Sequence, residues 1–184
     1  MSPKPASSNI DTLPDLLGKG LSLVFVGINP GIYSSTQGHY YANQGNLFWW
    51  ALNNSGLVSV KVTPEDDVSL LSYGIGFTDV VKRPSNSSSE LSKDEFRVGA
   101  ANLITKIRQY RPLVACFNGL TGYRQCFGIS AYPGPQELIV GRTKFFVIPS
   151  TSRRNARYQK ATILSLFIDL KDFLYTVTND VYHD

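Results

Sequence analysis

Cysteine is scarce in this sequence, and long apolar runs are absent. Cys116 and Cys126 are the only cysteines among 184 residues, and neither lies in a CxxC pair or beside a histidine. The sequence therefore gives no support for a disulfide scaffold, a structural zinc or an iron-sulfur cluster, and we expect a reducing compartment. No apolar run approaches the roughly 18 residues of a membrane span. The N-terminal MSPKPASSNIDTLPD also lacks the apolar core of a secretory signal, so we expect a soluble, intracellular protein.

Histidine is also scarce, and the phosphate-binding glycine motifs are missing. His39 and His183 are the only histidines, and no serine or cysteine in a recognisable nucleophile motif pairs with His39. The chain has neither GxxxxGK[ST] nor GxGxxG. A nucleotide hydrolase or transferase that uses NPGIYSSTQG as a phosphate loop is therefore a weak alternative. The net charge of +4 is compatible with a polyanionic partner but does not require one.

The sequence is long enough and apolar enough for one core. With 42% hydrophobic residues in 184, we expect a single domain. Residues 1–18 are polar and rich in proline and serine, which predicts a flexible N-terminal tail. The folded domain is expected over residues 19–175, followed by a C-terminal tail over residues 176–184.

Strand-like and helix-like segments alternate along the predicted domain. Buried strands are predicted at residues 21–28, 75–81, 113–118 and 143–150, and helices at residues 45–56, 63–74, 92–110, 119–128 and 160–175. The helix at 63–74 has a Thr63 cap followed by Pro64, and Ser92 with Glu95 forms a capping box for the next one. This order predicts an α/β fold with three layers, in which helices flank a central, mostly parallel sheet.

Ligands of such sheets bind outside the carboxyl ends of the strands. The segments that follow the predicted strands there are NPGIYSSTQGHYYANQGN, TDVVKRP, FNGLTG and PSTSRRNARY. We expect the functional residues in these four segments.

Several motifs in these segments and beside them resemble one known family. GINPG, GHYYANQGNLFWWAL, YGIGFTDVVKRP, LSKDEFRVGA, ACFNG and IPSTSRRNARY occur in order between about residues 13 and 174. Together they resemble the mismatch-specific uracil-DNA and thymine-DNA glycosylases, and PSTSRRNA and YGIGFT are more similar to the eukaryotic thymine-DNA branch. The resemblance implies a uracil-DNA glycosylase-like fold without a cofactor or metal. It also implies a monomer that acts on double-stranded DNA containing mismatched or damaged bases, in the nucleus if the source is eukaryotic and otherwise in the cytoplasm with the DNA.

The resemblance assigns the chemistry to an asparagine. Asn29 matches the residue that holds the attacking water, and the main chain of Ile28, Gly31 and Tyr41 is expected to stabilise the departing pyrimidine anion. Water suffices as the nucleophile because cleavage of an N-glycosidic bond leaves positive charge on the sugar. The residues alone leave another interpretation open, in which Asn29 forms an ordinary turn at a strand end.

Four side chains are expected to shape the base pocket. Tyr41 matches the aromatic residue that stacks on the flipped base. Ser34, Tyr40 and Asp79 occupy positions where the thymine-active branch tends to carry other residues, so uracil is expected as the main substrate. Asp79 leaves open a preference for other damaged bases. Together with Tyr40 it also leaves open a non-catalytic binder of mismatched DNA.

A basic loop before the last helix matches the segment that fills the gap left by the flipped base. It consists of Ser152, Arg153, Arg154, Asn155 and Ala156, with Arg154 at the position of the wedge. Without the resemblance this would be read as a solvated basic loop. No lysine of the motif blocks is expected near Asn29, so the resemblance implies a monofunctional enzyme that leaves an abasic site.

Overall fold

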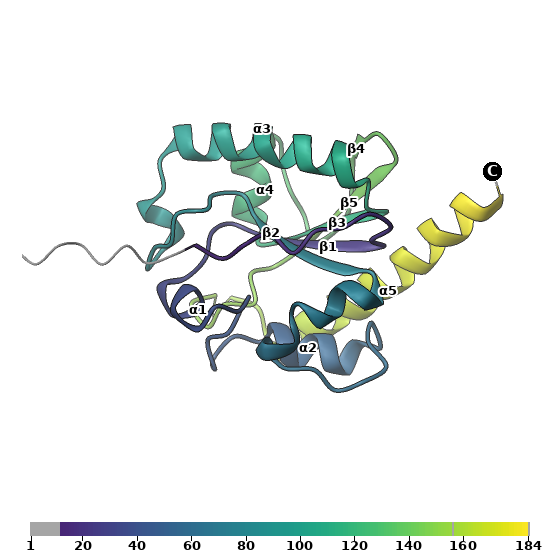
Figure 1. Cartoon of the computed structure of the whole chain (residues 1–184), viewed down its shortest axis with the longest axis horizontal. Helices are drawn as coiled ribbons and strands as arrows, with labels where there is room; N and C mark the ends of the chain where they lie inside the picture. The colour runs from purple at the N-terminus through teal and green to yellow at the C-terminus, as the bar shows by residue number, and fades with distance from the viewer. Residues whose placement is uncertain (1–11, 156, 184) are drawn as a thin grey trace, which may run out of the picture.

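The computed structural model describes residues 12–155 and 157–183 and contains a central five-stranded sheet (Figure 1). The strand order across it is β2-β1-β3-β5-β4, and only β4 runs antiparallel to its neighbour among the described strands. The strands are β1 (Leu23–Gly27), β2 (Ile75–Asp79), β3 (Val114–Asn118), β4 (Gly134–Val140) and β5 (Thr143–Ile148). The predicted three-layer α/β fold is confirmed.

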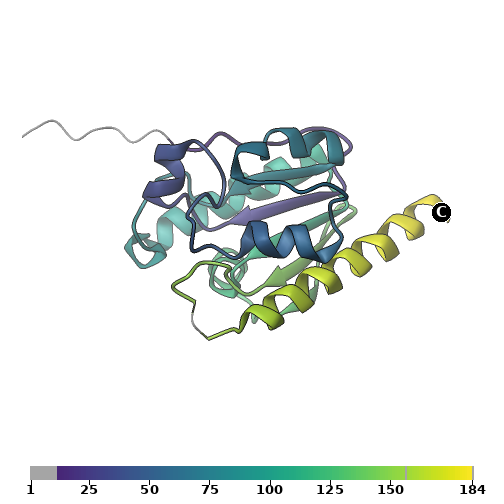
Figure 2. The ribbon, with the colours of Figure 1, turned by 90° about the horizontal axis from the view of Figure 1, so that it is seen from below.

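Helices cover both faces of the sheet. Figure 1 shows α3 and α4 on one face and α2 and α5 on the other, and Figure 2 shows α2 and α5 from below. The α-helices are α1 (Ile32–Gln37), α2 (Phe48–Ser55), α3 (Lys93–Tyr110), α4 (Leu120–Phe127) and α5 (Lys160–His183), and the short 3₁₀ helices are η1 (Pro64–Asp66), η2 (Ser69–Tyr73) and η3 (Ser88–Glu90).

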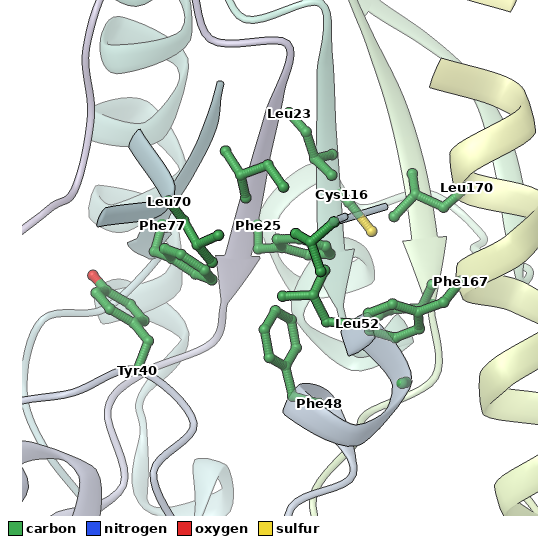
Figure 3. Packing of buried hydrophobic residues seen from close by; sticks show 14 of the residues in the cluster. Leu23, Phe25, Tyr40, Phe48, Leu52, Leu70, Phe77, Cys116, Phe167 and Leu170 are labelled. Atoms are coloured by element: carbon green, nitrogen blue, oxygen red, sulfur yellow. The ribbon is translucent and has the colours of Figure 1, made fainter. Parts of the chain in front are cut away.

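The alternation of side chains along β1 divides the core into two clusters. Leu23 and Phe25 face α2 and α5, whereas Val24 and Val26 belong to the cluster beneath α3 and α4. On the first side, the Phe25 ring meets the edge of Phe48 at a centroid distance of 4.8 Å and stacks on Phe167 at 5.9 Å (Figure 3). Both faces of β1 are buried, which explains why its sequence is continuously apolar.

The predicted tails are shorter than the sequence indicated. Leu13 and Leu16 are buried, and two backbone hydrogen bonds of 2.9 Å tie Leu16 to Phe77 in β2. The flexible tail predicted over residues 1–18 therefore does not include residues 12–18; residues 1–11 lie outside the described chain. At the other end, α5 continues to His183 and its Val177 is buried in the core, which corrects the tail predicted from residue 176.

Further elements differ from the prediction, and α1 and η3 form where no helix was expected. The helix expected over residues 63–74 is instead η1 and η2, since the buried Asp67 carboxylate turns inward to accept a 2.9 Å hydrogen bond from the Tyr40 amide. β4 was not predicted. It lies at the sheet edge with alternating exposure and begins with Gly134 and Pro135, so it lacks the apolar run of a central strand.

None of the helices in the described structure combines the length and apolar character needed to span a membrane. Within residues 12–155 and 157–183, no three His, Cys, Asp or Glu side chains gather in a way that could hold a metal ion.

Candidate active site

The polar residues predicted from the sequence meet at the carboxyl edge of the parallel strands. Asn29 follows β1 by two residues, Asp79 ends β2, and Asn118 ends β3. Thr151 follows β5 and exchanges two hydrogen bonds with the Asn118 amide, of 2.8 and 2.9 Å. Parallel strands end on the same side of a sheet, so the topology gathers these segments from distant parts of the chain.

The Asn29 side chain is held in one orientation. Its Nδ2 donates to the Ser85 hydroxyl at 2.8 Å and to the backbone oxygens of Arg83 and Pro30 at 3.0 and 3.2 Å. Backbone oxygens only accept hydrogen bonds, so the nitrogen must face them. Oδ1 then faces the other way, and no described residue donates a hydrogen bond to it. Asn29 therefore offers one free, neutral acceptor at the edge of the sheet.

Ser85 is a site residue that sequence reasoning missed. It is 4% exposed; its hydroxyl accepts from Asn29 and donates to the Ser87 backbone oxygen at 2.8 Å. Its amide donates to the Pro30 backbone oxygen at 3.2 Å. It lies in RPSNSSSELS, a stretch rich in serine and without apolar periodicity, which is typical of a flexible connector. The one available signal was that it follows a predicted strand end.

An ion pair between Arg83 and Glu95 links the segment around Ser85 (residues 83–87, the Ser85 segment) to α3. Arg83 Nε and one terminal nitrogen contact the two carboxylate oxygens of Glu95 at 2.8 and 3.1 Å. The same guanidinium donates to the Glu90 backbone oxygen at 3.0 Å. The hydrogen bond from Arg83, followed by one from the Ser92 amide, lowers the pKa of Glu95 to about 2. Arg83, whose backbone oxygen accepts from Asn29, is thus also held through its side chain.

Tyr41 lies at a sharp bend with its ring turned inward. Its φ of 54° is in the left-handed region, which few residues other than glycine adopt. The ring stacks on Phe48 at a centroid distance of 4.2 Å, and its hydroxyl is buried without a hydrogen-bond partner among the described residues. Burial, assisted by the charge of Asp79, raises the pKa of this hydroxyl, while the neighbouring Asn118 side chain acts in the opposite direction.

Tyr40, expected in the base pocket, is placed differently. Its side chain is 2% exposed, its ring stacks on Phe77 at 5.3 Å, and its hydroxyl donates to the Pro14 backbone oxygen at 3.0 Å. The ring therefore belongs to the core, as Figure 3 shows, and no surface of it is left for a base. The sequence did not reveal this because a single aromatic residue beside Tyr41 has no periodicity to place it.

The other predicted pocket residues hold the loops together. The Ser34 hydroxyl is buried and accepts a 3.1 Å hydrogen bond from the Ala42 amide, which ties α1 to the bend at Tyr41. The Ile28 backbone oxygen accepts from Val81 at 2.8 Å. Gly31 is exposed and caps α1 in an extended conformation. Their proposed contacts to a departing base stay predictions.

Asp79 is 2% exposed, and its side chain crosses over β1. A Cβ placed on Gly27, its register partner, would lie 2.2 Å from Asp79 Oδ1, so only glycine leaves room for the carboxyl group. Burial raises the pKa of Asp79 to about 7, and the charge of Asp15 adds to the rise, while Lys82 and Lys106 oppose it.

The predicted insertion loop projects from the same edge. Arg153 and Arg154 are exposed, and the Arg154 guanidinium donates to the Asn86 backbone oxygen, next to Ser85. Asn155 donates to the Ser150 backbone oxygen at 2.8 Å, and the Ser152 hydroxyl accepts from the Arg154 amide at 3.4 Å. Ala156 lies outside the described residues. The loop thus presents Arg154 beside the segment that holds Asn29, whereas the Arg153 side chain lies against Gly45.

Comparison with known proteins bears on the family and the fold of the chain. The family model for the uracil DNA glycosylase superfamily matches residues 14–171. Among solved structures, the chain is similar to the solution NMR structure of a candidate uracil DNA glycosylase from Methanosarcina acetivorans. The TM-score is 0.54 and the identity 20%, over 88% of this chain and 98% of that one, a likeness that bears on the fold alone. Since the family model spans most of the sequence, the chain belongs to the uracil DNA glycosylase superfamily.

Proposed function

We propose that the protein is a monofunctional DNA glycosylase that removes uracil from G·U mispairs by hydrolysing the N-glycosidic bond. Membership of the superfamily supports the reaction class. The observation that carries the proposal is the orientation of Asn29, whose Nδ2 is fixed by three acceptors while Oδ1 remains free.

Asn29 Oδ1 accepts a hydrogen bond from the attacking water and directs the water oxygen to C1′ of the nucleotide. The breaking bond leaves positive charge on the sugar and negative charge on the pyrimidine, so the water needs orientation more than deprotonation. A neutral amide gives this orientation without the cost of desolvating a charged group. Backbone amides near Gly31 and Tyr41 face the developing charge on the base.

The base must leave the helix before the water can reach it. Rotating a base out of a duplex costs a few kcal/mol, and a mispair lowers that cost. Arg154 enters the vacated position in the stack, and Arg153 binds a backbone phosphate beside it. The exposure of both arginines and the nearness of Arg154 to the Ser85 segment support this assignment.

The reaction stops at an abasic site. A lyase step would need an uncommitted amine, and Lys82, the lysine closest in sequence to the end of β2, donates to Asp15 at 2.8 Å. Lys106 contacts the same carboxylate at 2.6 Å. Thymine is a poorer substrate than uracil, because the Ser34 hydroxyl and its bond to Ala42 restrict the loop that would accept the extra methyl group.

Single-turnover incubation with labelled G·U, G·T and A·U duplexes, followed by alkaline cleavage of abasic sites, tests the proposal. We expect strand scission on G·U, less on G·T, and a loss of at least 100-fold with Asn29→Ala. Without alkali the strand should stay intact.

The outcomes separate the alternatives. If the wild type produces no abasic sites but binds G·U duplexes, the protein is a mismatch binder and the glycosylase assignment is wrong. Full activity in Asn29→Ala would show that another group holds the water.

A further inference from the structure

A groove of about 530 Å³ lies between α2 and the loop that follows it, on the sheet face opposite α3 (Figure 1). Trp50 and Asn54 line it from one side of α2, since residues four apart are neighbours on a helix surface. The exposed Val60 and Lys61 line it from the loop. Ligand sites in proteins commonly measure roughly 300 to 1,000 Å³. The groove is therefore large enough for a small ligand or for part of a polymer.

Hydrogen bonds and burial fix the shape of this groove. The Asn53 amide accepts from the Val62 backbone nitrogen at 2.8 Å and donates to the Val62 backbone oxygen at 2.7 Å, which ties the end of the loop to α2. Val58 and Val62 are buried on either side of the exposed residues 59–61. Because both ends of the loop are anchored before a ligand arrives, binding costs less conformational entropy than it would for a loose loop.

The groove combines an aromatic ring with positive charge. Trp50 is partly exposed, and the Lys160 ammonium at the start of α5 lies 3.9 Å from the centroid of its six-membered and five-membered rings taken together. Lys160 and Lys61 are both exposed, and within residues 12–155 and 157–183 the ion pairs of lysines involve other lysines. The charges of these two side chains are therefore available to an anionic ligand.

The segments around the groove carry charge of one sign. Residues 42–64 and 145–168 include α2, the loop after it and the first turns of α5, which lie side by side in Figure 2. They contain five lysines and arginines and no aspartate or glutamate. The whole chain has 18 basic and 14 acidic residues, so its net positive charge comes from these two segments. Such a surface attracts a polyanion.

We propose that this groove binds single-stranded nucleic acid, at a position separate from the candidate active site. Proteins that bind single strands combine a positively charged groove with aromatic rings on which bases stack. One base stacks on Trp50, and Lys61 and Lys160 bind neighbouring phosphates. The Lys160 side chain is long and exposed, so its ammonium can leave the ring for a phosphate when a base takes its place. A duplex fits less well, because its bases stack on each other and do not reach the indole.

The groove and the candidate active site lie at different places along α2. This helix begins near the carboxyl edge of the sheet, where Leu47 donates to the Thr151 backbone oxygen at 3.0 Å. It connects the parallel strands β1 and β2 and so runs back toward their amino ends, where the groove continues into the loop after α2. The inference therefore goes beyond the proposed function, and the two can be tested separately.

The probe is a labelled oligothymidine of about 12 nucleotides, within the range of known single-strand sites. Its affinity is measured by fluorescence anisotropy at several salt concentrations for the wild type, Trp50→Leu, Lys61→Gln and Lys160→Gln. We expect Trp50→Leu to weaken binding at least fivefold and each lysine substitution at least threefold. Each lysine substitution should also reduce the slope of log affinity against log salt by about 0.7.

Arg108→Gln is the matched control for charge. Arg108 is exposed near the end of α3, on the opposite face of the sheet, and its replacement also removes one positive charge. It should leave the affinity and the salt slope unchanged. The urea midpoints of Lys61→Gln and Lys160→Gln should match the wild type, so these two variants decide the test if Trp50→Leu is unstable.

Tryptophan fluorescence gives a second readout, which a change of charge alone does not move. The chain has two tryptophans, and the other one, Trp49, is 7% exposed with its indole donating to the Tyr40 backbone oxygen at 3.0 Å. A base stacked on Trp50 quenches its emission. Saturating oligothymidine should therefore quench the wild type and Lys61→Gln, and should leave Trp50→Leu unquenched.

Two results would overturn the inference. In the first, none of the three substitutions lowers the affinity for oligothymidine. In the second, a fully paired duplex of the same length binds at least as tightly and loses as much affinity in each variant, which would make the groove a duplex-binding surface. Uracil excision from a G·U duplex by saturating enzyme should be unchanged in all three variants. No excision by the wild type would contradict the proposed function and leave this inference in place.

Discussion

At the scale of single residues, the direction of one amide decides what the site can do. Asn29 presents nitrogen to Arg83, Pro30 and Ser85 and leaves oxygen free. The neighbouring Asn118 shows that residue type alone is not enough, because both ends of its amide are bonded to Thr151. One asparagine is available for chemistry and the other is structural.

Asn29→Asp tests this orientation with almost no change in shape. A carboxylate cannot donate to the two backbone oxygens that now accept from Nδ2, so it would turn away from them or be destabilised. We expect the single-turnover rate to fall at least 100-fold and the free energy of unfolding to fall by about 1 to 3 kcal/mol.

Asn54→Asp is the matched control. Asn54 is exposed on α2 and donates only to the Trp50 backbone oxygen in the preceding turn, at 2.7 Å. Its replacement should leave the excision rate unchanged. A rate for Asn29→Asp within threefold of the wild type would contradict the proposed role of the amide.

At the scale of elements, α3 supports the site without contributing a residue to it. Its N-terminal capping box contains Glu95, and the same carboxylate binds Arg83 in the Ser85 segment. The first turn of α3 therefore holds the backbone oxygen that orients Asn29.

Glu95→Gln should separate this positioning role from stability. Arg83 is about half exposed, and exposed ion pairs contribute little to stability, so we expect little change in the urea midpoint. The single-turnover rate should fall about threefold to tenfold, because the acceptors of Asn29 lose their fixed position. DNA affinity should be unchanged.

Asp94→Asn provides the comparison on the same helix. It removes the pairing of Asp94 with Arg97, at 3.4 Å, where both side chains are at least 75% exposed. It should affect neither rate nor stability. An equal loss of rate in the two variants would argue against a specific link between α3 and Asn29.

Predictability from sequence also varied by element. The central strands were predictable because burial on both faces produces apolar runs such as Leu21–Ile28. β4 was not predicted because an edge strand with one exposed face lacks such an apolar run. The Asn29 site was predicted from ordered motifs. The sequence did not indicate Ser85, which lies in a serine-rich segment, and it placed Tyr40 at the site although the Tyr40 ring is in the core.

At the scale of the whole molecule, the first described segment closes one side of the fold. Residues 12–18 lie against β2, where Leu13 packs in the cluster beneath α2 and Asp15 binds Lys82 and Lys106. This segment joins β2, the loop after it and α3 in one unit.

Leu13→Ala measures what the segment contributes. Leu13 is 2% exposed, so we expect a loss of about 2 to 4 kcal/mol in the free energy of unfolding, from lost burial and the cavity left behind. Val68→Ala, at a position that is 58% exposed, should change it by less than about 0.5 kcal/mol. A change for Leu13→Ala as small as that would mean that the segment is detached in solution.

The buried pair of Asn118 and Thr151 has a consequence for the speed of base inspection. It fixes the root of the insertion loop to the end of β3, and Leu47 donates to the Thr151 backbone oxygen at 3.0 Å from another side. Fixing the backbone of one residue costs roughly 1 to 2 kcal/mol of conformational entropy. Because the root is already immobile, that cost falls only on the few residues of the tip at each encounter with a base pair. Under the proposed function, this small entropic cost per trial would let the protein test and release normal pairs quickly as it moves along DNA.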